Sequence, residues 1–297
     1  MQTSAELAAM RRAIIISASG LGSTSPNPPV GCVILDAEGS TAGEGYHLYK
    51  GSAHAEVNAL AAAGARAAGG TAVVTLEPCN HTGLTPACHQ GLLDAGIARV
   101  LIAVLDPTSR GEGGAERLRR AGVEVETHVL EQEALVVLAP WLASLAWQRP
   151  VLHLLRQLDT SGHPAPPSTE AVAEADKQRL VHDLVISAKD VVEEGRPGCH
   201  GTSVFRLPTG PLPAAPEAAV IHLTATGART VLLTGTSKLS DRLLGAGLVD
   251  RLTFLQPIPT PSRTAASDAS LPLPEGYALS RITRVGEQLV ITAERRS

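Results

Sequence analysis

Aromatic side chains are scarce in this 297-residue chain: Phe, Tyr and Trp make up 2% of it, although hydrophobic residues make up 44%. Single-stranded nucleic acids are commonly held by stacking their bases on such rings. The formal net charge of −4 also gives no positive field for a phosphate backbone. We therefore predict that the partner is not a nucleic acid, and that Ala, Val, Leu and Ile build the core.

Long apolar runs are absent as well. No run approaches the roughly 20 residues that cross a bilayer, and the apolar stretch after Arg11 and Arg12 is too short for a signal peptide. We therefore expect a cytoplasmic protein with no membrane partner. In such a reducing compartment, a close cysteine pair such as Cys79 and Cys88 favours metal binding over a disulfide.

Strands alternate with helices over the first 148 residues. Apolar runs at 30–35 and 71–76 predict buried strands, and the segment 53–67 predicts a helix with Ser52 as its N-cap. This alternation is typical of an α/β sandwich with a largely parallel sheet. After residues 147–150 the sequence becomes richer in Pro and less regular in its pattern. We therefore predict one domain over 1–148 and a second over 149–297.

Four residues of the first domain form a pattern with chemical meaning. A catalytic zinc site takes three protein ligands and leaves one position for water. His54, Cys79 and Cys88 supply one nitrogen and two thiolates, and Glu56 is placed to act as the general acid and base. The order H-x-E, then P-C, then a further cysteine is that of zinc nucleobase deaminases. His89 is an alternative ligand, as is His81, and each part of the pattern alone is also typical of an ordinary helix start or loop.

Five stretches extend this pattern to a family resemblance: NPPVGCVI, GEGYHLYKGSAHAEVNAL, TLEPCNHTGLTPAC, GLLDAGIARVLIAVLDP and GGAERLRRAGVEV. In this order they resemble the deaminase domain of RibD-type riboflavin-biosynthesis proteins, over about residues 5 to 148. The resemblance implies a cytidine-deaminase-like three-layer α/β/α sandwich, Zn²⁺ as cofactor, and hydrolysis of the exocyclic amino group of a phosphoribosylated diaminopyrimidinone. It also implies that Asn27 and His47 line the substrate pocket, with the backbone at Ala55 and Cys79. From the residues alone, Asn27 before Pro28 is equally a turn residue, and His47 is equally a strand histidine without a role.

The cysteine loop departs from the family pattern at one position. Leu84 stands where the family carries Lys or Arg, and leucine neither donates a hydrogen bond nor neutralises an anion. We therefore predict a deaminase whose small-molecule substrate has changed to a related aminopyrimidine or amidine. Two alternatives stay open: an ordinary deaminase of the riboflavin pathway, and a non-catalytic, zinc-stabilised binding or scaffold subunit.

The second domain, 149–297, resembles the family's smaller reductase domain, which implies a dihydrofolate-reductase-like α/β fold. Leu155 replaces the family's lysine, and Thr234-Gly235-Thr236 replaces the E-G-G turn at which the backbone approaches the cofactor phosphate. We therefore predict a degenerate reductase domain that does not bind NADPH. Its apolar segment 229–258 is predicted to hold a homo-oligomer together, as a dimer.

Overall fold

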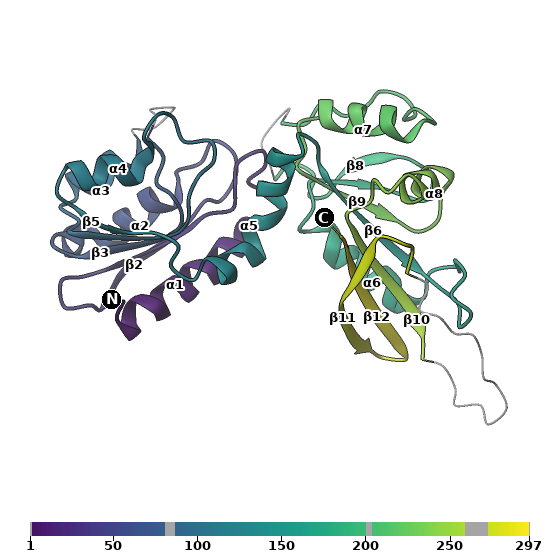
Figure 1. Cartoon of the computed structure of the whole chain (residues 1–297), viewed down its shortest axis with the longest axis horizontal. Helices are drawn as coiled ribbons and strands as arrows, with labels where there is room; N and C mark the ends of the chain where they lie inside the picture. The colour runs from purple at the N-terminus through teal and green to yellow at the C-terminus, as the bar shows by residue number, and fades with distance from the viewer. Residues whose placement is uncertain (1, 81–86, 200–203, 259–272, 297) are drawn as a thin grey trace. The chain divides into compact units, whose positions relative to one another are not determined.

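The computed structural model describes residues 2–80, 87–199, 204–258 and 273–296. The chain forms two compact units, one running to Ala139 and the other beginning at Pro140. The division falls inside one helix, α5 (Glu131–Ala146), and the predicted domain boundary at 148 lies just after that helix (Figure 1). Among the described residues, none of the helices is both long and apolar enough to cross a membrane.

The first unit is a five-stranded sheet with helices on both faces. The sheet has the order β2-β1-β3-β4-β5. Its elements in chain order are α1 (Ser4–Ser17), β1 (Gly31–Leu35), β2 (Thr41–Tyr46), α2 (Ala55–Ala63), β3 (Thr71–Leu76), α3 (Cys88–Asp94), β4 (Arg99–Val104), α4 (Gly113–Arg120) and β5 (Glu124–Glu126).

This sheet is mixed, so the prediction of a largely parallel sheet is wrong. Strand β1 pairs antiparallel with both β2 and β3, whereas β3–β4 and β4–β5 pair in parallel. The cause is local: β1 and β2 are joined by the short turn 36–40, and a tight turn can connect only antiparallel neighbours. Helices α3 and α4 connect the parallel neighbours β3, β4 and β5, and α2 connects β2 to β3 on the other side of β1.

The helices form the expected three layers around this sheet. Figure 1 shows α2, α3 and α4 over one face and α1 over the other. A core of mostly small aliphatic side chains, which includes the fully buried Ile34 and Ile102, packs between the sheet and α2 to α4. Helix α2 lies unusually close to β2, because a Cβ on Gly45 would stand 2.5 Å from the carbonyl oxygen of Ala55. The missing side chain at Gly45 therefore lets the start of α2 rest on the sheet.

The second unit is built on a seven-stranded mixed sheet with the order β11-β12-β10-β6-β9-β7-β8. Strand β6 is central and pairs in parallel with both β9 and β10. The elements are β6 (Val151–Gln157), α6 (Thr169–Arg179), β7 (Leu184–Ile186), β8 (Val192–Glu194), α7 (Pro216–Ala225), β9 (Thr230–Thr234), α8 (Lys238–Gly245), β10 (Arg251–Pro257), β11 (Tyr277–Val285) and β12 (Gln288–Arg295).

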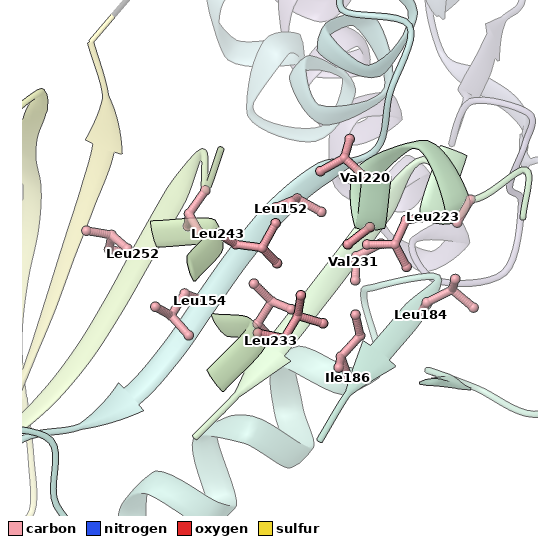
Figure 2. Close-up of a cluster of buried hydrophobic side chains, with 14 of the residues drawn as sticks. Leu152, Leu154, Leu184, Ile186, Val220, Leu223, Val231, Leu233, Leu243 and Leu252 are labelled. Atoms are coloured by element: carbon pink, nitrogen blue, oxygen red, sulfur yellow. The ribbon is translucent and has the colours of Figure 1, made fainter. Parts of the chain in front are cut away.

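The two faces of this second sheet carry separate clusters of apolar side chains. Leu152 and Leu154 of β6 point to one face, where Val220 and Leu223 of α7 and Leu243 of α8 join them (Figure 2). Leu155 points to the other face and packs under α6. This alternation along a strand is what the period of two requires. Both units are therefore α/β, as the sequence predicts.

Candidate active site

Helix α2 opens at the HAE motif, and its N-cap is His54 rather than the predicted Ser52. The Ser52 hydroxyl instead donates to the carbonyl oxygen of Tyr49 at 2.7 Å, within the turn before the helix. His54 has extended backbone angles, and its ring makes no capping hydrogen bond to the helix. The side chain of an N-cap residue normally accepts a hydrogen bond from a free backbone N–H group in the first turn of the helix. Because His54 does not, its imidazole is available to other partners.

Those partners are the two predicted cysteines. Cys79 follows β3 in a loop, and Cys88 is the first residue of α3. His54 Nδ1 lies 3.1 Å from Cys88 Sγ and 3.7 Å from Cys79 Sγ. The backbone N–H of Cys88 donates to Cys79 Sγ at 3.2 Å. Cys79 and Cys88, which follow His54 by 25 and 34 residues, therefore lie beside it in the fold. The starts of α2 and α3 and the loop after β3 bring the three side chains together.

The donor set fits zinc. With Zn–N about 2.0 Å and Zn–S about 2.3 Å, the edges of a tetrahedral site are about 3.5 Å for N–S and about 3.8 Å for S–S. The three ligand atoms lie within 4.8 Å of one another, and they form the one group of this kind among the described residues. His89 is not a member of this group. Its Nδ1 lies 3.2 Å from the carbonyl oxygen of Cys79 instead. His54, Cys79 and Cys88 could therefore hold the metal and leave one position open.

Because His54, Cys79 and Cys88 lie so close together, each shifts the pKa of the others. Hydrogen bonds from Cys88 and from His54 lower the pKa of the Cys79 thiol. The same pairing with Cys79, together with burial, raises the pKa of Cys88. The pKa of His54 is raised chiefly by its hydrogen bond to Cys79. One thiolate is thus already favoured without the metal, and metal ligation requires the second thiol to ionise.

Glu56 lies in the first turn of α2 and is only 4% exposed. Burial raises the pKa of its carboxyl group to about 7, against the lowering effect of backbone hydrogen bonding and of His54. It is not one of the three grouped donors, yet it lies within hydrogen-bonding reach of Cys88. A buried carboxyl group with a pKa near neutrality can both accept and return a proton.

Asn27 and His47 also meet at this site. Asn27 Nδ2 lies 3.3 Å from His47 Nε2, and His47 Nδ1 lies 3.1 Å from the carbonyl oxygen of Ala53. The carbonyl can only accept, so Nδ1 carries the proton and Nε2 accepts from Asn27. Burial lowers the pKa of His47, which favours this neutral form. The His47 ring stands edge-on to that of His54, with centroids 5.5 Å apart.

Three positions named in the sequence analysis remain: Ala55, Leu84 and His81. Ala55 is fully buried at the start of α2. Leu84 and His81 lie outside the described residues, so the expectation built on Leu84 stays a prediction. Two functional candidates escaped the sequence reading: Glu77 and Asn80 are buried on either side of Pro78 and Cys79. The signal for both was present, because polar residues crowd the end of an apolar strand in TLEPCN.

Comparison with known proteins identifies the class first. Residues 3–104 match the family model described as the cytidine and deoxycytidylate deaminase zinc-binding region. The chain is 48% identical over 126 residues to a diaminohydroxyphosphoribosylamino-pyrimidine deaminase of Buchnera aphidicola (subsp. Acyrthosiphon pisum), covering 42% of this chain and 85% of that protein. It is also 48% identical over 126 residues to the riboflavin biosynthesis protein RibD of Escherichia coli, covering 34% of that protein.

The fold comparison extends over both units. A diaminohydroxyphosphoribosylaminopyrimidine deaminase/5-amino-6-(5-phosphoribosylamino)uracil reductase from Thermotoga maritima superposes with a TM-score of 0.79. It has 23% sequence identity and covers 98% of this chain and 99% of that chain. At this identity the likeness concerns the fold alone. It agrees with the expected order of a deaminase fold followed by a reductase-like fold.

The chain therefore belongs to the RibD-type family of zinc-dependent hydrolytic deaminases. The sequence match to the RibD relatives from Escherichia coli and Aquifex aeolicus spans 34% and 41% of their lengths. That match lies in the deaminase part, so the activity of the second unit is a separate question.

Proposed function

We propose that this protein hydrolyses the exocyclic amino group of a phosphoribosylated diaminopyrimidinone and releases ammonia. The observation that carries the proposal is the meeting of His54, Cys79 and Cys88 beside the buried Glu56. The identity of 48% to a protein named diaminohydroxyphosphoribosylamino-pyrimidine deaminase, over 85% of that protein's length, supports the choice of substrate.

The proposed chemistry assigns each group one task. His54, Cys79 and Cys88 hold zinc, which when bound makes a water molecule nucleophilic at neutral pH. Glu56 accepts a proton from the attacking water and delivers it to the departing nitrogen. A C–O bond forms at the ring carbon, its C–N bond breaks, and ammonia leaves. Glu56 suits both transfers by its position, because it lies two residues after His54 in the first turn of α2 and is buried beside Cys88.

Substrate orientation is assigned to Asn27 and His47. The Asn27 amide nitrogen is directed at His47 Nε2, which leaves Oδ1 as the acceptor, and no partner of Oδ1 is found among the described residues. An acceptor at this point suits an N–H of an aminopyrimidine ring. The neutral His47 acts through Asn27, since its other nitrogen is held by the carbonyl of Ala53.

The comparisons support the ordinary riboflavin-pathway substrate better than the changed substrate that Leu84 suggested. Leu84 lies outside the described residues, so it supplies no structural argument. The Buchnera aphidicola relative, 48% identical over 126 residues, carries the name of the ordinary deaminase, and the Escherichia coli relative carries the name of a riboflavin biosynthesis protein. We therefore take the ordinary substrate as the proposal, and a changed substrate or a scaffold role as other outcomes of its test.

For the second unit we propose that no reduction takes place. A cavity of about 480 Å³ lies at the carboxyl ends of β6 and β9, where ligands of α/β sheets bind. Half of its described lining is Pro and Ala, and this lining holds no Lys or Arg and has Asp176 as its one charged residue. The nearby Arg156 guanidinium is already bonded to Asp241 and Ser240. Phosphates of a dinucleotide would therefore meet a negative charge and no cation, so NADPH does not fit this lining.

Three expectations from the sequence stay predictions: the cytoplasmic location, the absence of a nucleic-acid partner, and a dimer formed through the second unit. The last is checked by light scattering on the full-length protein. A monomer at micromolar concentration would contradict it.

The proposed activity is tested by ammonia release from the zinc-loaded, full-length protein. The substrates are the phosphoribosylated diaminopyrimidinone, its dephosphorylated form and a set of simple aminopyrimidines, with Glu56→Gln as the control. Release from the phosphorylated compound that depends on Glu56 supports the proposal. Release only from the other compounds would show a changed substrate, and no release from any, with zinc bound, would favour the scaffold role.

A further inference from the structure

The loop that carries Cys79 is tied to a segment far away in the sequence. Glu77, two residues before the cysteine, is 7% exposed and receives three hydrogen bonds from the region between β4 and α4. Its Oε1 accepts from the backbone N–H of Ala115 at 2.9 Å. Its Oε2 accepts from the N–H of Asp106 and from the hydroxyl of Ser109, both at 3.2 Å. Backbone and hydroxyl donors thus satisfy both oxygens of this carboxylate.

Glu77 takes the place of a cap that helix α4 lacks. The residue at the helix's own N-cap position, Glu112, makes no side-chain hydrogen bond to the helix. Ala115 is the third residue of α4, so its N–H is one of the orphan donors of the first turn. Glu77 satisfies that donor from 38 residues away, and its carboxylate lies at the positive end of the helix.

Asn80, on the other side of Cys79, makes the second tie. Its Nδ2 donates to the carbonyl oxygen of Arg110, and its Oδ1 accepts from the N–H of the same residue at 3.3 Å. The Asn80 side-chain amide thus hydrogen-bonds with both the carbonyl oxygen and the N–H of Arg110, and these two bonds fix the orientation of the amide. Asn80 is 5% exposed, so these hydrogen bonds are shielded from water.

Two glycines show how tightly the two segments fit. A Cβ on Gly113 would lie 2.4 Å from Glu77 Oε1, and one on Gly114 would lie 1.9 Å from the carbonyl oxygen of Pro78. Gly113 also has a φ of +80°, which favours glycine. The start of α4 therefore presses directly on the backbone next to Cys79, with no side chain between them.

We propose that Glu77 and Asn80 are positioning residues for the zinc site: they hold Cys79 at the distance from His54 and Cys88 that the metal requires. Hydrogen bonds around metal ligands commonly change metal affinity by about 10- to 100-fold when they are removed. The ties act on the loop of Cys79, whereas Cys88 is held by its own helix and His54 by the start of α2. Cys79 is thus the ligand whose position depends on contacts distant in sequence.

The test is zinc affinity of the full-length protein, measured by competition with a chromophoric chelator. Glu77→Gln keeps the size of the side chain but replaces one accepting oxygen with an NH₂ group. That group faces a hydrogen-bond donor, so at least one hydrogen bond is lost. It is expected to weaken zinc binding by about 10- to 100-fold. Glu112→Gln is the matched control: it removes the same charge at the same end of α4, where Glu112 pairs only with exposed arginines. Its zinc affinity is expected to equal that of the wild type.

Ser109→Ala provides a milder variant that removes one of the three hydrogen bonds. It is expected to lower zinc affinity by roughly 2- to 10-fold, the equivalent of one hydrogen bond. Wild-type zinc affinity in Glu77→Gln would overturn the proposal, even if that variant melted at a lower temperature. Should Glu77→Gln not fold, wild-type affinity in Ser109→Ala would overturn it instead. The zinc titration of the wild-type protein tests the proposed metal site separately, because a wild type that binds no zinc would refute that site and not only the roles of Glu77 and Asn80.

Discussion

Each unit places histidines next to a sheet, but the two units use their imidazoles in opposite ways. In the first unit, His54 makes no bond to its own helix and its Nδ1 faces two sulfur atoms. In the second unit, His182 Nδ1 is 2.7 Å from the carbonyl oxygen of Gln178, and its Nε2 is 3.2 Å from His153 Nδ1. His153 Nε2 in turn lies 2.9 Å from the hydroxyl of Thr253.

The hydrogen bonds of the second pair run in one direction. Because a carbonyl only accepts, His182 Nδ1 carries a proton and its Nε2 accepts from His153. His153 Nε2 then accepts from Thr253. All four ring nitrogens are occupied, so this buried pair has no lone pair left for a metal. A histidine next to a pocket becomes a ligand only where the fold leaves one nitrogen uncommitted, as it does at His54.

The largest expected effect comes from removing the metal. Dialysis against a strong chelator is expected to abolish ammonia release, and added Zn²⁺ to restore it, because the thiolates hold zinc directly. The measurement is activity against zinc content determined by atomic absorption. Full activity at a zinc content near zero would refute a zinc-dependent reaction.

Glu56→Gln is expected to reduce kcat by about 10²- to 10⁴-fold, the usual contribution of a general acid–base group. Zinc content should stay at the wild-type level, because Glu56 is not one of the grouped donors. Steady-state kinetics and metal analysis on the same preparation check both. A variant that loses zinc together with activity would show that Glu56 supports the metal rather than the proton transfer.

The buried histidine pair makes the second unit sensitive to acid. Burial lowers the pKa of His182 from 6.5 to about 4, and the positive charge of Arg251 contributes to this lowering. The unfolded chain then binds more protons than the folded one below pH 6.5, so stability falls as pH decreases from 6.5 toward 4. The full effect is on the order of 3 kcal/mol.

Urea unfolding at pH 7 and pH 4.5 measures this dependence. His182→Gln is expected to lose less stability between the two pH values than the wild type does. His222→Gln, which changes an exposed histidine of α7, serves as the control and should behave as the wild type. Equal acid sensitivity in all three proteins would assign the effect to other groups.

The smallest expected effect is the response of the second unit to NADPH. Its cavity has no described cation, so millimolar NADPH is expected to leave the melting temperature unchanged. Thermal unfolding followed by intrinsic fluorescence measures this. A concentration-dependent rise in melting temperature would mean that the domain retains its cofactor site.

The residues of the proposed zinc site could be named from the sequence because their signals are local. His54 and Glu56 lie at a helix start, Cys88 opens another helix, and their order along the chain is itself informative. The Ser52 cap was wrong because sequence patterns do not fix which residue begins a helix. The parallel sheet was wrong because the turn at 36–40 forces β1 and β2 into an antiparallel pair.

The hydrogen-bond partners of Glu77, of Asn80 and of the buried pair His153 and His182 could not be predicted, for one physical reason. Each of these residues depends on a partner between 29 and 100 residues away in the chain. The sequence by itself determined the donor types, the acid and the alternation of helices and strands, because these follow from side-chain chemistry and local periodicity. Only the tertiary structure decided which nitrogen of which histidine is free, and what holds Cys79 in place, because hydrogen bonds between distant segments exist only after folding.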